Sequence, residues 1–195
     1  QLFGLLLAGY ETTANALTWT WYLLSQNPWA LERMRQEVRQ ELDGKTPAYE
    51  DLERLPFLRQ TLEESLRLYP PAWMLGRRAI GDDVIGGYDV PAGTVLAISI
   101  YTLHRHPGFW ENPEIFDPSR FEPHKVAGRH KYAYIPFGGG PRMCIGSGFG
   151  LLEAALIMAC VAQRYELRLA PGTEVQPQAI FVLRPNRDML MSLHA

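Results

Sequence analysis

The stretch that decides the fold is "IPFGGGPRMCIG", residues 135–146. Three consecutive glycines lead into Pro141 and Arg142, and Cys144 follows just before Gly146. A segment with the apolar pattern of a helix begins directly after this loop. A helix N-terminus, a nearby cation and free backbone N–H groups all stabilise the thiolate form of cysteine. The sequence therefore marks Cys144 as a candidate ligand or nucleophile.

Three kinds of site use a cysteine in such a setting. A nucleophilic enzyme needs a base, and no histidine lies near Cys144 in sequence, although a distant histidine can serve. A zinc or iron–sulfur centre needs about four ligands with paired spacing, and Cys160 is the other cysteine of the chain. A haem iron needs only one thiolate from the protein. The pattern favours haem, with a buried free cysteine in a turn as the structural alternative.

The glycines around Cys144 favour a flat ligand. Residues 138–140 and Gly146 carry no side chains, so a broad planar group can approach the backbone closely. Pro141 stiffens the turn, and we expect Phe137 to shield the sulfur.

The composition is that of a globular protein. The chain has 195 residues, of which 47% are hydrophobic and 21% charged, and this length predicts one domain over residues 1–195. The net charge of −2 gives no bulk basic field for nucleic acid. Two cysteines exclude a disulfide framework and favour a reducing compartment. No signal peptide is visible, and the longest apolar run falls short of the roughly 20 residues needed to cross a bilayer.

The order of the expected elements predicts a mainly α protein with minor β. One long helix is expected from the start of the chain to Ser25 or Gln26. Asn27 is expected to cap a second helix, which has Pro28 in its first position and stops at Gly44. The remaining expected elements are a helix at about 56–68, a hairpin and a further strand within 82–107, a long ordered loop over 108–136, a helix at about 146–163 and short strands in the tail.

The first residues lie inside a helical pattern. The chain opens with Gln1, and no N-cap precedes the long apolar helix. Such a helix needs partners on several sides, so we expect the chain to be the C-terminal part of a longer protein, with upstream residues completing the core. A processed or unusually bounded domain is the alternative.

Four motifs resemble the cytochrome P-450 family, in that family's order and over essentially the whole chain. "FGGGPRMCIG" is similar to the haem-binding loop, "AGYETT" (8–13) to the oxygen-activation segment, "EESLRLYPP" to the Glu-x-x-Arg segment, and "FDPSRF" to the aromatic–Pro–Glu–Arg–Phe segment. The resemblance corresponds to the C-terminal half of the family's fold, from the long distal helix onward. Ser119 departs from the pattern, since the family commonly has glutamate there, while Arg120 keeps the arginine position.

The resemblance implies a haem b cofactor with Cys144 as the axial ligand of its iron. It implies that Arg142 pairs with a haem propionate and that Arg77 pairs with the second one, for which Arg78 is an equally visible candidate. It also implies a place for His104 near the haem edge, with a packed or solvated histidine as the alternative. The cofactor-binding residues implied are Cys144, Arg142, Arg77, Phe137, Gly138 and Gly146.

The resemblance implies two further groups of residues. On the long helix, Thr12 would hold water and dioxygen while Glu11 relays protons, the alternative being an ordinary helical threonine beside a solvated glutamate. Glu64 and Arg67 share one helix face, and the resemblance implies that this pair is buried, contacts the loop around Arg120 and has a structural role.

The implied activity is that of a haem-thiolate monooxygenase. Such an enzyme inserts one atom of dioxygen into an apolar organic substrate, with two electrons from a ferredoxin or a flavin reductase. The alternatives are a relative that uses peroxide and a truncated haem-binding half that is not catalytic alone. The stretch "GRRAIGDDVIGGYDVPAGT" (76–94) is of bacterial type, which favours a cytoplasmic protein, and a membrane anchor upstream stays open. The resemblance also implies a substrate pocket lined by Trp73, Met74, Leu75 and Phe181, with core packing as an equally good alternative. Just before the cysteine loop, the basic run of Arg129, His130 and Lys131 is a candidate docking patch for the electron donor, although a solvated charge run is the favoured interpretation.

Overall fold

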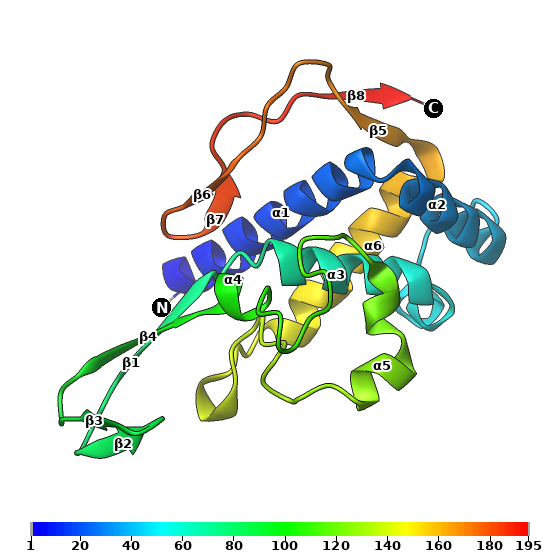
Figure 1. Cartoon of the computed structure of the whole chain (residues 1–195). Helices are drawn as coiled ribbons and strands as arrows, with labels where there is room; N and C mark the ends of the chain where they lie inside the picture. Colours follow the sequence, from blue (N-terminus) through cyan, green and yellow to red (C-terminus); the bar gives the residue numbers. More distant parts are fainter. Residues whose placement is uncertain (1, 195) are drawn as a thin grey trace.

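The computed structural model describes residues 2–194, which form a helical body with small antiparallel sheets at its margins (Figure 1). The helices are α1 (Leu2–Gln26), α2 (Pro28–Leu42), α3 (Pro56–Leu68), α4 (Ile100–Leu103), α5 (Pro123–Ala127) and α6 (Ser147–Arg164). The strands are β1 (Met74–Arg78), β2 (Asp83–Ile85), β3 (Tyr88–Val90), β4 (Val95–Ser99), β5 (Glu166–Leu169), β6 (Pro177–Ala179), β7 (Leu183–Pro185) and β8 (Met191–His194). Short 3-10 turns cover Tyr49–Arg54, Pro118–Phe121 and Gly140–Arg142. The expected class, mainly α with minor β, is confirmed.

The core lies where α1, α2, α3 and α6 pack on one another. The apolar faces of these helices supply its fully buried side chains, including Leu24, Met34, Leu58, Leu62 and Met158. Burying such a side chain stabilises the fold by about 1.5–3 kcal/mol. The four helices therefore form the rigid frame on which the loops between them are held.

The junction between α1 and α2 differs from the expectation. Pro28 does occupy the first position of α2, but the side chain of Asn27 makes no capping hydrogen bond to α2. Its Nδ2 instead donates to the carbonyl of Leu23 at 2.8 Å and so satisfies an acceptor at the end of α1. Asn27 therefore occupies the predicted N-cap position, but the capping hydrogen bond expected of its side chain is wrong. α2 ends at Leu42, where Asp43 already takes a left-handed conformation with φ of 47° ahead of Gly44.

Each sheet has two antiparallel strands: β1 pairs with β4, β2 with β3, β5 with β8, and β6 with β7. The hairpin of β2 and β3 turns at Gly86 and Gly87, which both have positive φ. It projects with β1 and β4 away from the helical body (Figure 1). The tail returns to α1, because Nε1 of the buried Trp19 donates to the carbonyl of Leu183 at 3.0 Å.

The long segment between α4 and α6 is ordered, as its aromatic content predicts. Trp110, Phe116 and Phe121 are buried, and α5 and two short turns lie within it. This segment covers α3 on one side, because the turn at Pro118–Phe121 contacts that helix. It therefore connects the helical frame to the glycine-rich loop that follows.

Candidate functional site

The glycine-rich loop presents Cys144 at the surface, directly before α6. The amide of Cys144 donates to the carbonyl of Phe137 at 3.0 Å, which closes the loop, and Gly146 occupies the N-cap position of α6. A methyl group on Gly146 would lie 3.9 Å from Sγ of Cys144, so the sulfur sits against the start of the helix. Cys144 is exposed and unbridged, so the alternative of a buried cysteine is wrong.

Two glycines of the loop need their conformational freedom. Gly138 and Gly140 have φ of 76° and 69°, a region that costs other residues roughly 1–2 kcal/mol. A methyl group on Gly138 would also lie 3.3 Å from Cδ1 of Leu75 on β1. The loop therefore passes close to β1. Phe137 is half-buried and packs against the helical core, which anchors the start of the loop.

The close approach of the loop to Leu75 shows which of the two arginines of β1 lies on the face of the strand near the loop. Side chains two apart on a strand share a face, so Arg77 lies on the same face as Leu75, and Arg78 on the other. Arg77 is half-buried, and its Nη1 donates to the carbonyl of Gly76 at 2.8 Å. Arg78 is exposed and its Nη1 reaches the carbonyl of Gly93 at 3.5 Å. Of the two arginines, Arg77 is on the side of the cysteine loop.

The acid–threonine segment lies in the N-terminal half of α1, which continues without a break through it. Oγ1 of Thr12 donates to the carbonyl of Ala8 at 2.6 Å, an i−4 contact that competes with the helical hydrogen bond. Glu11 is half-buried. The next residue, Thr13, is near α6, because a methyl group on Gly150 would lie 3.8 Å from its Oγ1. The structure thus brings this part of α1 over the first turn of α6, whose N-cap is beside Cys144.

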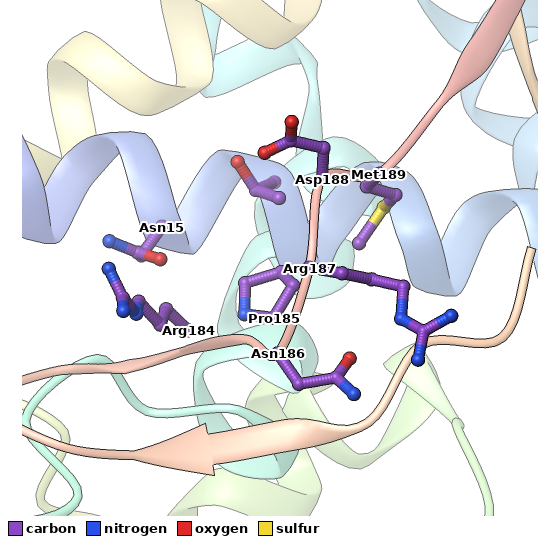
Figure 2. Close-up of a pocket in the computed structure, with 8 residues that line it drawn as sticks. Asn15, Arg184, Pro185, Asn186, Arg187, Asp188 and Met189 are labelled. Atoms are coloured by element: carbon purple, nitrogen blue, oxygen red, sulfur yellow. The ribbon is translucent and has the colours of Figure 1, made fainter.

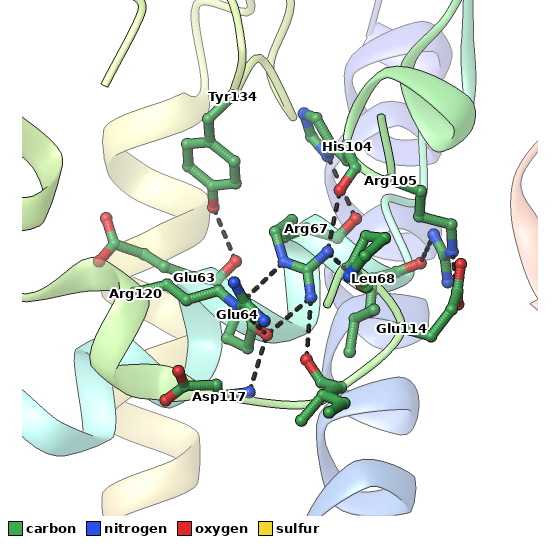
Figure 3. A network of polar contacts seen from close by, with 12 residues as sticks. Glu63, Glu64, Arg67, Leu68, His104, Arg105, Glu114, Asp117, Arg120 and Tyr134 are labelled. Carbon is green, nitrogen blue, oxygen red and sulfur yellow. Dashed lines mark hydrogen bonds and ion pairs between the residues drawn. The ribbon is translucent and has the colours of Figure 1, made fainter. Parts of the chain in front are cut away.

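Glu64 and Arg67 form a fully buried ion pair on α3 (Figure 3). Nε of Arg67 donates to Oε2 of Glu64 at 2.7 Å and Nη2 to Oε1 at 2.8 Å. The remaining N–H groups donate to the carbonyls of His104, Pro113 and Ile115. All five donors of the guanidinium therefore have acceptors, as a buried arginine requires.

The carboxylate of Glu64 also binds the segment beyond α4. Its Oε1 accepts the amide of Asp117 at 2.9 Å and lies 3.5 Å from Nε of Arg120. Burial raises the pKa of Glu64, while the hydrogen bond and charge of Arg67 and the Asp117 amide oppose that rise. The pair thus holds α3 and the long ordered segment together, and its burial leaves it out of reach of a ligand.

His104 lies in the interior and not at the edge of an open site. It has no exposed surface, its Nδ1 is 3.2 Å from the carbonyl of Arg67, and its Nε2 accepts the amide of Ile135 at 2.9 Å. Its ring stacks on Tyr134 with centroids 5.2 Å apart. No sequence pattern pointed to these contacts, because they join residues 37 and 31 positions apart.

The proposed docking run is not uniform. Arg129 is half-buried, its guanidinium carbon lies 4.3 Å from the Trp110 ring and 4.7 Å from the Phe121 ring, and it donates to the carbonyl of Arg120. His130 and Lys131 are exposed. Arg129 therefore belongs to the packing of the long segment, and only its two neighbours present their side chains at the surface.

Apolar side chains are exposed beside the cysteine loop and on the tail. Ile145 is 98% exposed and Phe149, four residues later, is 70% exposed, and exposed apolar side chains that lie near one another mark a surface that another group can cover. Met74 and Phe181 are also exposed, and Nε1 of Trp73 donates to the carbonyl of Ile180 at 3.0 Å. The hydrogen bond ties the tail to the start of β1, so the two segments predicted to line a substrate pocket do lie together.

A polar hollow of about 370 Å³ lies between α1 and the tail (Figure 2). Asn15 and Thr18 form one wall, and residues 184–189 form the other, with Arg184 and Asp188 among them. None of the predicted site residues lines it.

Within residues 2–194, no three His, Cys, Asp or Glu side chains are grouped to hold a metal ion. The zinc and iron–sulfur alternatives for Cys144 thus lack their further ligands in the described part of the chain. The same residues contain no helix with the length and apolar character of a membrane span.

The sequence profile described as Cytochrome P-450 matches residues 1–192. The chain belongs to the cytochrome P-450 family. Two similar proteins come from Streptomyces melanosporofaciens. Cyclooctatin synthase is 43% identical over 178 residues, which are 91% of this chain and 39% of that protein. Cyclooctat-9-en-7-ol 5-monooxygenase is 41% identical over 173 residues, which are 89% of this chain and 38% of that protein.

The fold agrees with a solved member of the family. The haem domain of cytochrome P-450DA superposes with a TM-score of 0.94 at 34% identity, covering all of this chain and 43% of that one. The chain thus spans about two fifths of the length of the proteins it matches.

Membership of the cytochrome P-450 family implies a haem cofactor. The residues present fit a haem: one exposed thiol stands at a helix N-terminus, the loop around it has a bare glycine backbone, and apolar side chains are exposed next to it. A planar, largely apolar group with a single protein ligand matches this donor set.

Proposed function

We propose that this chain supplies the thiolate ligand and the oxygen-side helix of a haem-thiolate monooxygenase, as one part of a single catalytic domain. The enzyme would insert one atom of dioxygen into an apolar organic substrate and reduce the other to water. The observation that carries the proposal is the exposed Cys144 at the start of α6, in a loop closed by the Cys144–Phe137 hydrogen bond.

Cys144 would bind the iron of haem b through its sulfur. The sulfur lies beside the N-terminus of α6, the end of a helix that carries partial positive charge. When bound, the haem supplies dioxygen binding and O–O cleavage, which a thiolate ligand favours. Arg142, which is exposed on the loop, and Arg77, on the loop side of β1, would pair with the propionates, because a guanidinium suits a carboxylate. Gly138, Gly146 and Phe137 would shape the contact surface.

Thr12 and Glu11 would deliver protons on the α1 side. The Thr12 hydroxyl donates to Ala8, so its lone pairs remain able to accept a hydrogen bond from water. Glu11, half-buried one residue earlier, would exchange protons with that water. The close approach of Thr13 to Gly150 supports this assignment, because it brings α1 over the helix that begins beside Cys144.

The expected substrate class follows from side chains near the same site. Exposed apolar side chains on β1 and the tail, Met74 and Phe181, favour an apolar substrate. Electrons would come from a ferredoxin or a flavin reductase. One similar protein carries the name cyclooctat-9-en-7-ol 5-monooxygenase, which supports a monooxygenase acting on an organic molecule.

The direct test is the carbon monoxide spectrum of the reduced, haem-loaded protein that contains this chain. We expect a strongly red-shifted Soret band, which reports thiolate on iron, and its loss in Cys144→Ser. Cys160→Ser is the matched control, because Cys160 is equally exposed and free but lies on α6. Retention of the band in Cys144→Ser, or its absence from the unsubstituted protein, would overturn the proposal.

A further inference from the structure

We propose that His104 is a positioning residue that couples the buried Glu64–Arg67 pair to the cysteine loop by accepting the amide of Ile135. This inference rests on the proposed function, since the loop it positions is the one that would carry the ligand. Four observations carry it: the contacts of the ring, its tautomer, the path from Ile135 to Cys144, and the packing around the imidazole.

The contacts of His104 join α3, through Arg67, to the start of the cysteine loop, through Ile135. The contacts with Arg67 are reciprocal. Arg67 and His104 contact each other twice. Nη1 of Arg67 donates to the backbone carbonyl of His104 at 2.9 Å, and the ring of His104 contacts the backbone carbonyl of Arg67. The reciprocal pair fixes His104 on α3 (Figure 3). Any displacement of Arg67 therefore moves the imidazole with it.

The hydrogen-bond partners fix the tautomer of His104. The amide of Ile135 is a donor, so Nε2 must accept from it, and the ring proton must lie on Nδ1, where it donates to the carbonyl of Arg67. Such a ring must be neutral. Burial lowers the pKa of His104 to about 3, with the charges of Arg67 and Arg105 acting in the same direction, so the neutral form is the one present at ordinary pH.

Ile135 is the residue from which the cysteine loop starts. Its carbonyl accepts the amide of Gly138 at 2.9 Å, and two residues after Ile135 the carbonyl of Phe137 accepts the amide of Cys144 at 3.0 Å. Phe137 lies inside the turn that the bond between Ile135 and Gly138 closes, so the position of Ile135 sets the position of the acceptor for Cys144. His104 holds that peptide from the interior.

The packing around the imidazole leaves it little freedom. Tyr134 stacks on the ring, and its hydroxyl donates to the carbonyl of Glu63 at 2.9 Å. Trp110 meets the ring edge-on with centroids 6.5 Å apart. The His104 side chain thus contacts α3 and two aromatic rings, and its one acceptor binds the loop. Such a side chain can position the loop, but it has no access to a ligand.

Two substitutions separate the hydrogen bonds of His104. In His104→Asn the amide nitrogen takes roughly the place of Nδ1, so the bond to Arg67 can remain while the acceptor for Ile135 is lost. In His104→Gln the amide oxygen takes roughly the place of Nε2, so Ile135 keeps an acceptor. His124→Gln is the matched control, because His124 is exposed and its Nε2 lies 3.8 Å from the carboxylate of Glu122 on the surface.

The first readout is hydrogen exchange of the amides of residues 135–144, measured by mass spectrometry on the protein that contains this chain. We expect exchange about tenfold faster in His104→Asn, because a buried N–H without an acceptor favours local opening. His104→Gln and His124→Gln should exchange as the unsubstituted protein does. Equal exchange in His104→Asn and His104→Gln, whether fast or slow, would overturn the proposal.

The second readout is the fraction of the reduced carbon monoxide complex in the red-shifted band. We expect a loss of that fraction in His104→Asn at a concentration of urea well below unfolding, and no loss in His104→Gln. If His104 had only a general structural role, both variants would lower the unfolding midpoint alike and leave the ratio of the two bands unchanged. That result would contradict the proposal. If the unsubstituted protein lacks the band, the proposed function fails, while the exchange experiment still decides the role of His104.

Discussion

Thr12 and Thr18 make the same contact six residues apart on α1. Each hydroxyl donates to the carbonyl four residues earlier, at 2.6 Å in Thr12 and 2.8 Å in Thr18. Their effects on helix stability should therefore be alike, and only their places on the helix differ. The pair allows a functional role of Thr12 to be separated from a helical one.

We expect Thr12→Ala to lower the product formed per electron consumed by about tenfold, part of the roughly 100-fold that positioned proton transfer contributes. The measurement is the amount of product formed, compared with the number of electrons taken from the electron donor, in the complete enzyme. Thr18→Ala should leave this ratio unchanged. Full coupling in Thr12→Ala would show that Thr12 has no role in proton delivery.

A second prediction at this scale concerns His104 and pH. Its pKa is lowered from 6.5 to about 3 by burial, so the unfolded chain takes up a proton at a higher pH than the folded one. The stability contributed by the neutral ring is therefore complete above pH 6.5 and is lost as pH falls toward 3.

We expect this loss to reach about 2 kcal/mol between pH 6.5 and pH 5, at 1.36 kcal/mol per pH unit. The measurement is urea unfolding of the unsubstituted protein and of His104→Gln at pH 7 and pH 5. The variant lacks the titrating ring, so its stability should fall by about 2 kcal/mol less over the same interval. Parallel losses in both proteins would show that His104 is not buried as a neutral ring.

Candidate site residues could be named from the sequence where they lie together in one motif. The thiol of Cys144, its glycines and Arg142 are adjacent in the chain, so their spacing alone indicated a common site. The role of His104 could not be predicted, because its partners, Arg67 and Ile135, come from segments more than 30 residues away. Side chains that act through backbone carbonyls and amides leave no pattern of residue types.

At the scale of the element, α3 depends on its buried ion pair. Glu64 is wholly buried and accepts three hydrogen bonds, two of them from Arg67. Its removal leaves the guanidinium of Arg67 without its counter-ion in the interior. The pair of Glu32 and Arg39 on α2 is similar in distance, at 2.9 Å, but both side chains are exposed.

We therefore expect Glu64→Ala to lower the free energy of unfolding by about 3–5 kcal/mol, and Glu32→Ala to lower it by about 0–1 kcal/mol. Urea unfolding of the two variants, made in the longer protein that contains this chain, measures the difference. A similar small loss in both would mean that water reaches Arg67 and that α3 is not held by this pair.

The helices were predicted from sequence more completely than the strands. Periodic apolar residues and prolines at the first position indicated α2 and α3, and the glycine loop indicated the start of α6. β1 was not predicted, because "MLGRR" has a glycine in its centre and no alternation. α5 was not predicted either, because five residues are too few to show a period of 3.6.

At the scale of the whole molecule, the described chain exposes more surface than its mass predicts. Its accessible surface is 11949 Å², whereas a compact monomer of 22.1 kDa should expose about 9,300 Å². Large apolar side chains contribute to the excess, among them Tyr10 on α1, Ile145 beside Cys144 and Phe181 in the tail. This surface is available to be covered by residues outside the chain.

We expect the chain produced alone to bind a hydrophobic dye strongly and to lack a cooperative thermal transition. A longer protein that contains it should bind little dye and melt cooperatively. Dye fluorescence and calorimetry on the two proteins measure this. A cooperative transition in the isolated chain, with haem bound in equal amount, would show that residues 1–195 are a complete unit.

The contact between Trp19 and Leu183 has a consequence for synthesis on the ribosome. The two residues are 164 positions apart, and chains grow at about 5–20 residues per second. Leu183 is therefore synthesised about 8 to 33 seconds after Trp19, and the indole has no acceptor from Leu183 during that time. During that interval the nascent polypeptide is open to capture by chaperones, so yield in cells should depend on how well they hold it.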